Sequence, residues 1–448
     1  MKNRRSFIKK SSMGIVGASL LYPFYNTSAK SYSRILGSND RITLAFQGLG
    51  RRFPGLLNSS LKMKNVEIKY FCDVMDNQLD KANNSYYNLT KQKVSSEKDI
   101  HKIIDDKDVD ALIIATPDHW HTYAACKGME AGKHIYLEKP CSHNLKESEL
   151  LVNYQSYYNK SVQMGNQQRS SYETADLIKL LQNGIIGDLK KAEAYYNNNR
   201  PRVPNQIKAP IPDGLDWSLF QGPSKRKPYT FNTWDYNWRW YGWDFGTGEA
   251  GNNATHELDV ARWALGVHYP ESVDVYSSKN HFIDDGWTMY DTMEAKFHFP
   301  NNLKIDWNCH SRNAHYNKIM GGRGTVIYGS TGSALVNRNG YTVYNLNGKE
   351  IKNSISIDKE SSTQLGGGGN MTTKHFRNFF NSIRNGEVLN SPINDAVISQ
   401  SMVHYANLAH RSGKSFKIDS RNGNILDRKI KKKFWSREYE KGWSLNFV

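Results

Sequence analysis

Two side chains far apart in the sequence, Lys139 and His256, could together carry out acid–base chemistry on a hydroxyl group. Lys139 follows the strand-like run 133–137 and precedes Pro140, so its ammonium would be held where it can hydrogen-bond a reacting hydroxyl and stabilise charge on the oxygen. The imidazole of His256 titrates near neutrality and could accept the hydroxyl proton. A lysine in a surface turn is the alternative for Lys139, which its place between a strand and a helix disfavours.

A glycine-containing turn and a later acidic residue indicate a dinucleotide site. Gly48 would permit a tight turn after the strand 42–46, and Gly50 would let backbone amides approach a pyrophosphate. Asp73 directly follows the next strand, where a carboxylate accepts hydrogen bonds from ribose hydroxyls and repels a 2′-phosphate, which favours NAD over NADP. Phe53 replaces the third glycine of the fingerprint, so the turn by itself could also be an ordinary strand-to-helix connection.

The elements that would position these residues alternate between short apolar strands and helix-length segments from Arg41 onward, the pattern of a parallel sheet built from βαβ units. The expected strands are 42–46, 66–71, 111–115 and 134–137, with a last strand and hinge at 163–166, and the expected helices are 77–87, 121–131 and 144–160. The sequence therefore predicts an α/β fold whose N-terminal Rossmann domain spans 40–165.

A second, α+β domain is predicted over 166–420, with a large, mostly antiparallel open sheet. Its expected helices are 172–183, 372–385 and 395–412, its expected strands are 189–196, 272–276, 292–299, 303–308, 324–328, 334–337 and 341–345, and 366–370 reads as a flexible loop. Residues 197–245 are rich in aromatic residues and proline and are expected to form a long insertion. Two domains agree with a chain of 448 residues.

The run Glu138-Lys139-Pro140, the segment 246–263 around His256, and the glycine turn with Asp73 together resemble the Gfo/Idh/MocA family of sugar and polyol oxidoreductases. The resemblance covers nearly all of residues 40–415. It implies bound NAD and redox chemistry on a carbohydrate, in which hydride leaves a sugar carbon for NAD while Lys139 polarises the oxygen and His256 moves its proton. By family analogy, a homodimer or homotetramer is also expected.

The resemblance implies further cofactor contacts. Residues 116–121 follow a strand at the carboxyl edge of the sheet and correspond to the loop near the nicotinamide, although His119 and His121 could instead cap a helix or lie on the surface. Glu138 would contact the nicotinamide side. The predicted cofactor contacts are Gly48, Gly50, Arg51, Asp73, Thr116, Pro117, His119, His121, Glu138, Lys139 and Asn166.

Substrate contacts are predicted at the hinge and in the insertion. Gln168 and Arg169 offer amide and guanidinium donors, and Trp238 and Arg239 lie in 231–245, where eight of fifteen residues are aromatic. Aromatic faces suit stacking on pyranose rings, but they could also anchor an irregular loop.

The residues around His256 leave two questions open. The family commonly has an aspartate four residues before this histidine, where this chain has Asn252; either Asn252 contacts substrate as a neutral partner or the acidic role has moved to Glu249. Asp259 and Arg262 could orient His256 or pair with each other. Weaker candidates for the cleft are Tyr195, Arg200, His310 and His315.

Residues 1–30 are predicted to be a twin-arginine signal peptide. Arg4-Arg5 is followed by Phe-Ile-Lys, a mild apolar stretch over 13–25 and a small-residue end at 27–29. A disordered basic tail is the alternative. The stretch is shorter than the about 20 apolar residues of a membrane anchor, so the membrane would matter only for export, and the folded protein would reach the periplasm with its cofactor.

The formal net charge is +17, part of it in the run 428–433. We expect a solvated basic C-terminal tail over 421–448 and no nucleic-acid partner, because no nucleic-acid-binding module accompanies the run. The four cysteines lie far apart without metal-like spacing, which predicts buried thiols and neither a disulfide framework nor a metal site.

Three functions fit these features. Outside the cytoplasm free NAD is not in ready supply, so the cofactor would have to be retained and recycled. A coupled redox reaction between two sugars would do this, and so would an NAD-dependent glycosidase that oxidises C3 transiently, eliminates the glycosidic bond, adds water and reduces the ketone. The third is a non-catalytic sugar-binding protein; Asn252 and Phe53 favour it, and the pair Lys139 and His256 argues against it.

Overall fold

The computed structural model describes residues 40–314, 321–355 and 370–445. The predicted signal peptide, His315 and most of the predicted loop 366–370 lie outside the described residues. Residues Ile42–Val448 form one of the two compact units of the chain, and the elements below belong to it.

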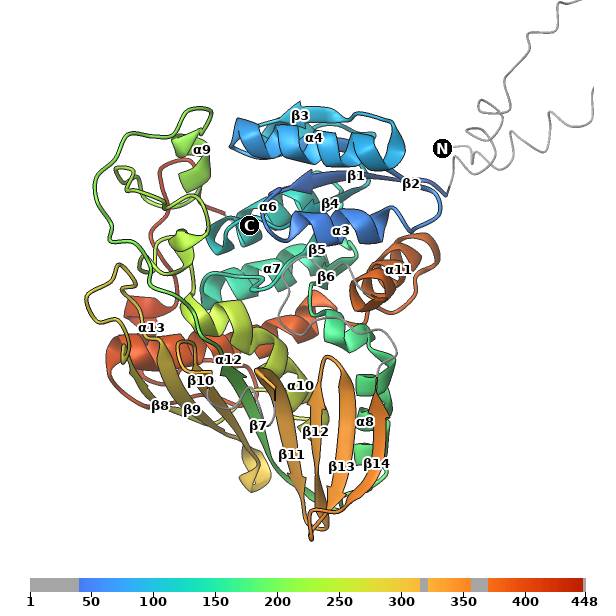
Figure 1. Ribbon diagram of the computed structural model, residues 1–448, viewed down its shortest axis with the longest axis vertical. Helices are drawn as coiled ribbons and strands as arrows, with labels where there is room; N and C mark the ends of the chain where they lie inside the picture. Colours follow the sequence, from blue (N-terminus) through green and yellow to red (C-terminus); the bar gives the residue numbers. More distant parts are fainter. Residues whose placement is uncertain (1–39, 315–320, 356–369, 446–448) are drawn as a thin grey trace, which may run out of the picture. The chain divides into compact units, whose positions relative to one another are not determined.

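A six-stranded, fully parallel sheet lies in the N-terminal part, in the order β3-β2-β1-β4-β5-β6 (Figure 1). Its strands are β1 (Ile42–Gln47), β2 (Val66–Cys72), β3 (Ser95–Glu97), β4 (Ala111–Ile114), β5 (His134–Leu137) and β6 (Val162–Met164). The central strands are apolar along their whole length, as in β4, because helices cover both faces of a parallel sheet. The predicted Rossmann domain is confirmed.

Alternate side chains of each strand point into two separate cores. Leu44 and Phe46 pack against α3 (Phe53–Ser60) and α4 (Asp76–Thr90) on one face. Ala45 faces the opposite core, which contains α5 (Ile100–Ile104), α6 (Asp118–Glu130) and α7 (Leu145–Tyr158).

A helix from late in the chain completes the first of these cores. Phe376, Phe379 and Phe380 of α11 (Asn370–Asn385) are fully buried against β1, α3 and Tyr136. The predicted domain boundary at residue 165 therefore does not separate the two domains completely. Helix α11 falls within the segment assigned to the second domain, but it packs in a core of the first.

The second sheet has nine strands in the order β14-β13-β12-β11-β7-β10-β9-β8-β15, and all neighbours are antiparallel except β7 and β10. Its strands are β7 (Leu189–Asn197), β8 (Ser272–Ser278), β9 (Thr292–His298), β10 (Lys304–His310), β11 (Arg323–Gly329), β12 (Gly332–Asn337), β13 (Gly340–Asn345), β14 (Glu350–Ile355) and β15 (Phe416–Lys417). The prediction of a large, mostly antiparallel sheet is confirmed.

One face of this sheet is buried under helices. Along β9, Met293, Ala295 and Phe297 are buried while Glu294 and Lys296 are exposed, the alternation of a half-covered strand. The buried face packs on α8 (Tyr172–Gln182), α10 (Thr255–Leu265) and α12 (Ile393–Ser412). The short elements η1 (Gln167–Ser170), η3 (Ala250–Ala254) and η4 (Pro300–Asn302) connect or extend these helices and strands.

The insertion over 197–245 carries only two short helices among its described residues, α9 (Trp217–Gln221) and η2 (Asn237–Arg239). Aromatic packing organises part of it. Trp240, for example, stacks on Trp287 with ring centroids 4.0 Å apart. Figure 1 shows the insertion beside the carboxyl end of the parallel sheet.

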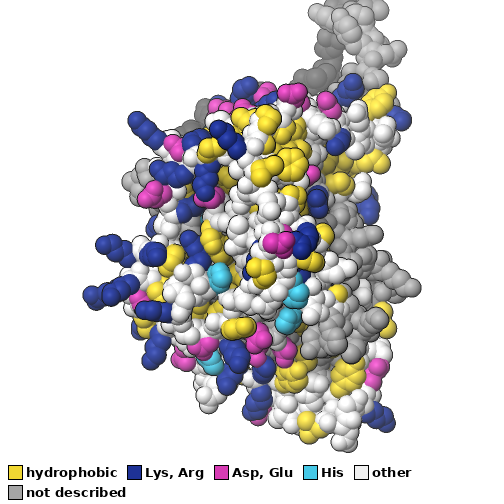
Figure 2. All heavy atoms as spheres, turned by 60° about the vertical axis from the view of Figure 1, so that its left-hand side comes forward, with side chains coloured by type: hydrophobic (Ala, Val, Ile, Leu, Met, Phe, Trp, Pro, Cys, Tyr) yellow, Lys and Arg dark blue, Asp and Glu magenta, His cyan; other side chains and the backbone are white. Residues whose placement is uncertain are grey.

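The prediction of a solvated C-terminal tail is wrong for residues 421–445. Within α13 (Arg428–Phe434), Ile430 and Phe434 lie four positions apart and are both buried, which docks the helix while its lysines stay outside. Beyond α13, Trp443 packs against Trp120 and Tyr123, with ring centroids 5.1 and 5.0 Å away. Figure 2, which brings the left-hand side of Figure 1 forward, shows lysine and arginine side chains interspersed with acidic ones on that face.

Three further findings concern the whole described part of the chain. All four cysteines are buried free thiols, as predicted. No helix among the described residues is long and apolar enough to cross a membrane. Within the same residues, no group of three or more histidine, cysteine, aspartate or glutamate side chains could hold a metal ion.

Candidate functional site

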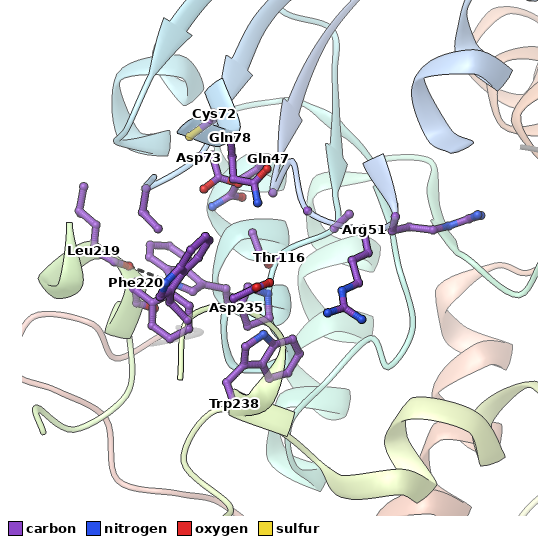
Figure 3. A pocket seen from close by; sticks show the side chains of 18 of the residues that line it. Gln47, Arg51, Cys72, Asp73, Gln78, Thr116, Leu219, Phe220, Asp235 and Trp238 are labelled. Carbon is purple, nitrogen blue, oxygen red and sulfur yellow. Dashed lines mark hydrogen bonds between the residues drawn. The ribbon is translucent and has the colours of Figure 1, made fainter. Parts of the chain in front are cut away.

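A cavity of about 1080 Å³, the first cavity, lies where β1, β2 and β4 end. One wall comes from these strand ends and the other from the insertion, through Phe220, Trp234 and Trp238. Figure 3 shows Gln47, Asp73 and Gln78 gathered at one end, Thr116 in the middle and Trp238 at the other end. The carboxyl edge of a parallel sheet is where such folds bind ligands.

The turn after β1 requires glycine at one position. Gly48 has a φ of +87°, and a Cβ there would come within 2.6 Å of the Ala115 carbonyl and the Thr116 nitrogen. Gly50 is different, because nothing lies within 4 Å of its Cβ position, so the space beside it is open. The predicted contacts Gly48, Gly50 and Arg51 all line the first cavity.

Phe53 explains the missing third glycine. Phe53 is the first residue of α3. Its ring is buried between those of Phe46 and Phe71, at centroid distances of 5.6 and 5.1 Å in edge-to-face geometry. The position that closely packed fingerprints give to glycine is here part of the hydrophobic core.

Asp73 lies at the end of β2 and lines the first cavity. Its two carboxylate oxygens accept hydrogen bonds from the backbone nitrogens of Leu49, at 2.8 Å, and Met75, at 3.1 Å. Burial raises the pKa of Asp73 to about 6, against the lowering effect of these donors. Each oxygen retains a lone pair for a hydroxyl donor.

Two other buried polar atoms of this cavity have no hydrogen-bond partner among the described residues: Gln47 Oε1 and Thr116 Oγ1. Buried polar atoms are nearly always paired, so their lack of a partner indicates that a ligand supplies one. With the open glycine turn and the Asp73 carboxylate, they fit the adenosine, pyrophosphate and nicotinamide portions of a dinucleotide.

The two predicted cofactor histidines lie outside the first cavity. His119 is fully buried between Phe220 and Phe245, with Nε2 2.8 Å from the Phe220 carbonyl oxygen, and burial lowers its pKa to about 3. It therefore supports the cavity wall from behind. His121 places its ring nitrogens 2.6 Å from the Pro140 carbonyl oxygen and 2.9 Å from that of Thr116, so it braces the Glu138-Lys139-Pro140 run.

A second cavity, of about 1170 Å³, adjoins the first, and the two share Arg52, Ala115, Thr116, Tyr236 and Arg239 in their walls. Lys139, His256 and Asn252 line it. The two residues predicted to be catalytic, 117 positions apart in sequence, thus face one space.

Lys139 precedes Pro140 through a cis peptide bond, and its Nζ donates to the backbone oxygen of Asn252 at 2.7 Å. Burial, and next the charge of Arg239, lower the pKa of Lys139 to about 7. A large fraction of this amine is therefore neutral at pH 7, ready either to donate or to accept a proton.

His256 is 8% exposed, at the start of α10. Burial holds its pKa well below the ordinary value, and the nearby charges of Arg338 and Lys139 add to the effect. The imidazole is neutral at physiological pH and can accept a proton. Asp259 does not orient it, because that carboxylate accepts hydrogen bonds from Arg169 and Ser399.

Glu138 lies in the second cavity wall between two donors. Arg52 Nε is 2.8 Å from its Oε1, and Gln167 Nε2 is 2.9 Å from the same oxygen. Burial alone would raise the pKa of Glu138, but the Arg52 charge brings it below the ordinary value. Arg52 thus ties the glycine turn to the Glu138-Lys139-Pro140 run.

Three hinge residues that the sequence proposed as contacts are not among the described residues that line either cavity. Arg169 pairs with Asp259 at 2.7 and 2.8 Å, Gln168 donates to Thr174 and Asn337, and Asn166 is buried outside both linings. Gln168 and Arg169, which the sequence proposed as substrate contacts, therefore do not line the second cavity, whereas their neighbour Gln167 does. A 3-10 turn over η1 directs adjacent side chains to different sides.

The aromatic insertion serves both purposes that its sequence allowed. Trp238 lines the first cavity rather than the second, and Arg239 lines both, with its guanidinium 4.2 Å from the centre of the Trp238 ring. Tyr236 lines both cavities with a backbone φ of +77°, an uncommon conformation for a side chain of this size.

Glu249 is fully buried behind the second cavity and ion-paired with Arg200 at 2.7 Å. Asn252 lines the second cavity and donates to the same carboxylate at 3.2 Å, so Glu249 holds the Asn252 side chain from behind. Arg262 pairs with Asp395, which leaves the predicted Asp259–Arg262 pair unformed in favour of two longer-range pairs. Tyr195 and His310 lie outside both linings, while Arg200 lines the second cavity.

Comparison with known proteins agrees with this architecture. Residues 42–166 match the Gfo/Idh/MocA model described as an oxidoreductase family NAD-binding Rossmann fold, and residues 178–418 match its C-terminal alpha/beta domain. The chain thus has the fold of the NAD-binding oxidoreductases of this family. It belongs to the Gfo/Idh/MocA family, and NAD is its cofactor.

Individual relatives are more distant. A glycosyl hydrolase family 109 protein of Shewanella pealeana is 26% identical over 209 residues, covering 43% of this chain and 46% of the relative, so the match spans about half the length of such curated relatives. An aldose-aldose oxidoreductase from Caulobacter crescentus, complexed with glycerol, has a TM-score of 0.63 at 16% identity, covering 84% of this chain and 100% of that one. A levoglucosan dehydrogenase complexed with NADH and levoglucosan has a TM-score of 0.63 at 19% identity, covering 84% and 99%. These structures share the fold.

Proposed function

We propose that this protein is an exported NAD-dependent enzyme that acts on a sugar or glycoside in the second cavity. One observation carries the proposal: Lys139 and His256 face the same cavity, and that cavity adjoins the dinucleotide cavity through shared walls. A non-catalytic binding protein has no need of a lysine whose pKa lies near 7 beside a neutral imidazole.

The first cavity would hold NAD, with Asp73 at the adenosine ribose, the Gly48–Gly50 turn at the pyrophosphate and Thr116 toward the nicotinamide. When bound, NAD supplies hydride transfer. Lys139, in its ammonium form, would hydrogen-bond the sugar oxygen and stabilise charge that develops there. His256 would accept the hydroxyl proton, and the insertion would exclude water from the two cavities.

A second candidate is glycoside cleavage with no net redox change, in which a sugar hydroxyl is oxidised transiently to a ketone, the glycosidic bond is lost by elimination, water adds, and the ketone is reduced back to give an ordinary sugar. The relatives named glycosyl hydrolase family 109 favour it, over the half of their length that matches. The likeness to an aldose-aldose oxidoreductase favours the coupled redox reaction. Both reactions recycle NAD, which agrees with the twin-arginine signal proposed for 1–30.

The test begins with protein purified from the periplasm of an expressing bacterium. Its denatured supernatant is assayed for NAD(H), and the native protein is incubated with nitrophenyl glycosides and, separately, with pairs of free sugars. Retained NAD with release of nitrophenol, and no oxidised sugar, supports the glycosidase. Retained NAD with one sugar oxidised and another reduced supports the coupled reaction. Protein that holds no nucleotide and shows neither activity contradicts the proposed function. Activity found in the cytoplasmic fraction alone contradicts the proposed export.

A further inference from the structure

Positive charge is concentrated around the second cavity. Among the described residues that line it, six side chains are lysine or arginine and one carries a carboxylate, which is Glu138; the six are Arg52, Lys139, Arg200, Arg239, Arg323 and Arg338. Walls that hold a neutral sugar need hydrogen-bonding groups but no such excess of one sign.

Three of these cations are neutralised by buried carboxylates. Arg52 pairs with Glu138, and Arg200 pairs with Glu249. Arg323 makes a two-pronged ion pair with Glu257, at 2.7 and 2.8 Å. These pairs give the wall rigidity and leave little net charge at their positions.

Arg239 is held differently. Its Nη1 is 3.4 Å from Oδ1 of Asp118, a long contact, and the other oxygen of Asp118 already accepts hydrogen bonds from the backbone and hydroxyl of Thr247. The Nε of Arg239 is buried without a hydrogen-bond partner among the described residues. Rings of Trp238 and Tyr236 fix the guanidinium in place, at 4.2 and 5.3 Å. A positioned guanidinium with donors to spare is suited to bind an anionic group.

Lys139 adds to the same field, and Arg338 lies in the same cavity wall. Lys139 donates to a carbonyl oxygen, which leaves its charge without a carboxylate counter-ion in that contact. The charge of Arg338 reaches His256, whose pKa it depresses, and Arg239 does the same to Lys139. A bound anion would reverse both effects, restoring the ammonium of Lys139 and making His256 a stronger base.

We propose that the sugar bound in the second cavity carries a negatively charged oxygen group, as a uronic acid, a sulfated sugar or a sugar phosphate does. The inference rests on the proposed function for the site and deepens it by naming the substrate class. Part of the positive field also serves the pyrophosphate of NAD, since Arg52 and Arg239 line both cavities. Arg200, Arg323 and Arg338 line the second cavity alone.

Binding is measured first, because it does not depend on turnover. Calorimetric titrations of the NAD-containing protein compare glucuronate, glucose 6-sulfate and glucose 6-phosphate with glucose, and galacturonate with galactose. We expect at least one anionic sugar to bind at least about tenfold more tightly than its neutral counterpart. Raising the salt from about 0.05 M to about 0.5 M should weaken that binding and leave the neutral sugar unaffected. The three anions distinguish carboxylate, sulfate ester and phosphate ester.

Arg338→Gln should remove most of the preference while the protein keeps its NAD, and Arg239→Gln should remove it as well. The matched control is Arg202→Gln, an exposed arginine paired with exposed Asp284 outside both cavities. Equal or tighter binding of the neutral sugars overturns the inference. So does binding of inorganic sulfate alone as tightly as any anionic sugar, with no effect of Arg338→Gln. If anionic sugars bind preferentially but no sugar is oxidised or cleaved, the proposed function fails and the substrate class stands.

Discussion

The pKa of Lys139 sets an expectation for the pH dependence of turnover. The structure lowers this pKa from 10.5 to about 7 through burial, so the ammonium form is present below pH 7 and is lost as pH rises above it. Because the proposed role needs the ammonium, kcat/KM should fall by about tenfold for each pH unit above this pKa. A pH–rate profile on the natural reaction measures it.

Two variants check the assignment. Lys139→Ala should reduce kcat by about 10²–10³-fold while sugar binding persists, since the lost hydrogen bond matters most when charge develops. Lys139→Arg keeps its charge at every accessible pH, so any residual activity should lose the decline above pH 7. A wild-type profile that is flat from pH 6 to 9 would contradict the role given to Lys139.

Asp73 leads to an expectation for cofactor retention. Its pKa in the folded protein is raised to about 6. Without ligand, the protonated group favours the folded state below its unfolded pKa, and this contribution to stability is lost as pH rises through 6 and the buried group becomes charged. Ribose hydroxyls would donate to the charged form, so NAD should dissociate faster as pH falls below about 6. Fluorescence of released NADH after reduction measures the rate.

The matched variant is Asp73→Asn. It should abolish the acid dependence of NAD release, because the amide does not ionise, although its NH2 group cannot accept one of the two backbone hydrogen bonds that the carboxylate accepts. Unchanged pH dependence in Asp73→Asn would mean that another group controls retention.

At the level of single residues, the sequence located groups at the ends of strands more reliably than those in the hinge η1. Lys139 and Asp73 could be predicted because the carboxyl end of a parallel strand has a known place in the fold. Gln167 and Gln168 are adjacent amides, and only the three-dimensional course of η1 decides which one faces the cavity. Arg323 had no local signal, because its place at the cavity depends on the pairing of β11 with β7.

Among the elements, the C-terminal segment after α13 acts as a strap behind one wall of the first cavity. Arg437 donates to the His119 carbonyl oxygen at 2.7 Å, to Glu147 at 3.0 Å and to the Ser224 hydroxyl at 3.0 Å. It thereby joins the first turn of α6, helix α7 and the loop after α9. The neighbouring residues Trp120 and Phe220 line the first cavity, so the strap supports this part of its wall from behind.

Arg437→Gln should therefore accelerate NAD loss several-fold and destabilise the protein by about 1–3 kcal/mol, as expected when buried acceptors lose a charged donor. Thermal unfolding and the rate of nucleotide release measure the two effects. Arg421→Gln is the control, because Arg421 is 87% exposed and pairs only locally with Asp419. Equal behaviour of the two variants would contradict the strap.

Periodicity predicted the long helices and strands but missed several short elements. β3, α5 and β15 have two to five residues each, too few to display a repeat. α13 was missed for a different reason: its lysines dominate the composition, while the two apolar residues that dock it are only one turn apart.

For the whole molecule, α11 and α12 join the two sheets into one structure. Phe379 of α11 is buried in the core of the parallel sheet, while α12 contributes Ile393 and Val397 to that domain and Met402 and Val403 to the other. A division of the chain near residue 165 could be read from the sequence, but the return of α11 could not. Contacts so distant in sequence leave no local pattern.

This arrangement predicts that the two domains unfold together. Phe379→Ala should destabilise the protein by about 3–5 kcal/mol, because a buried aromatic is replaced by a cavity. Differential scanning calorimetry of residues 40–445 should show one transition, shifted to lower temperature as a whole, and NAD should be lost at the same temperature. Phe231→Ala is the matched control, since Phe231 is 47% exposed and should leave the transition in place. A second transition that Phe379→Ala does not move would show instead that the nine-stranded sheet folds independently, and α12 would then not couple the domains.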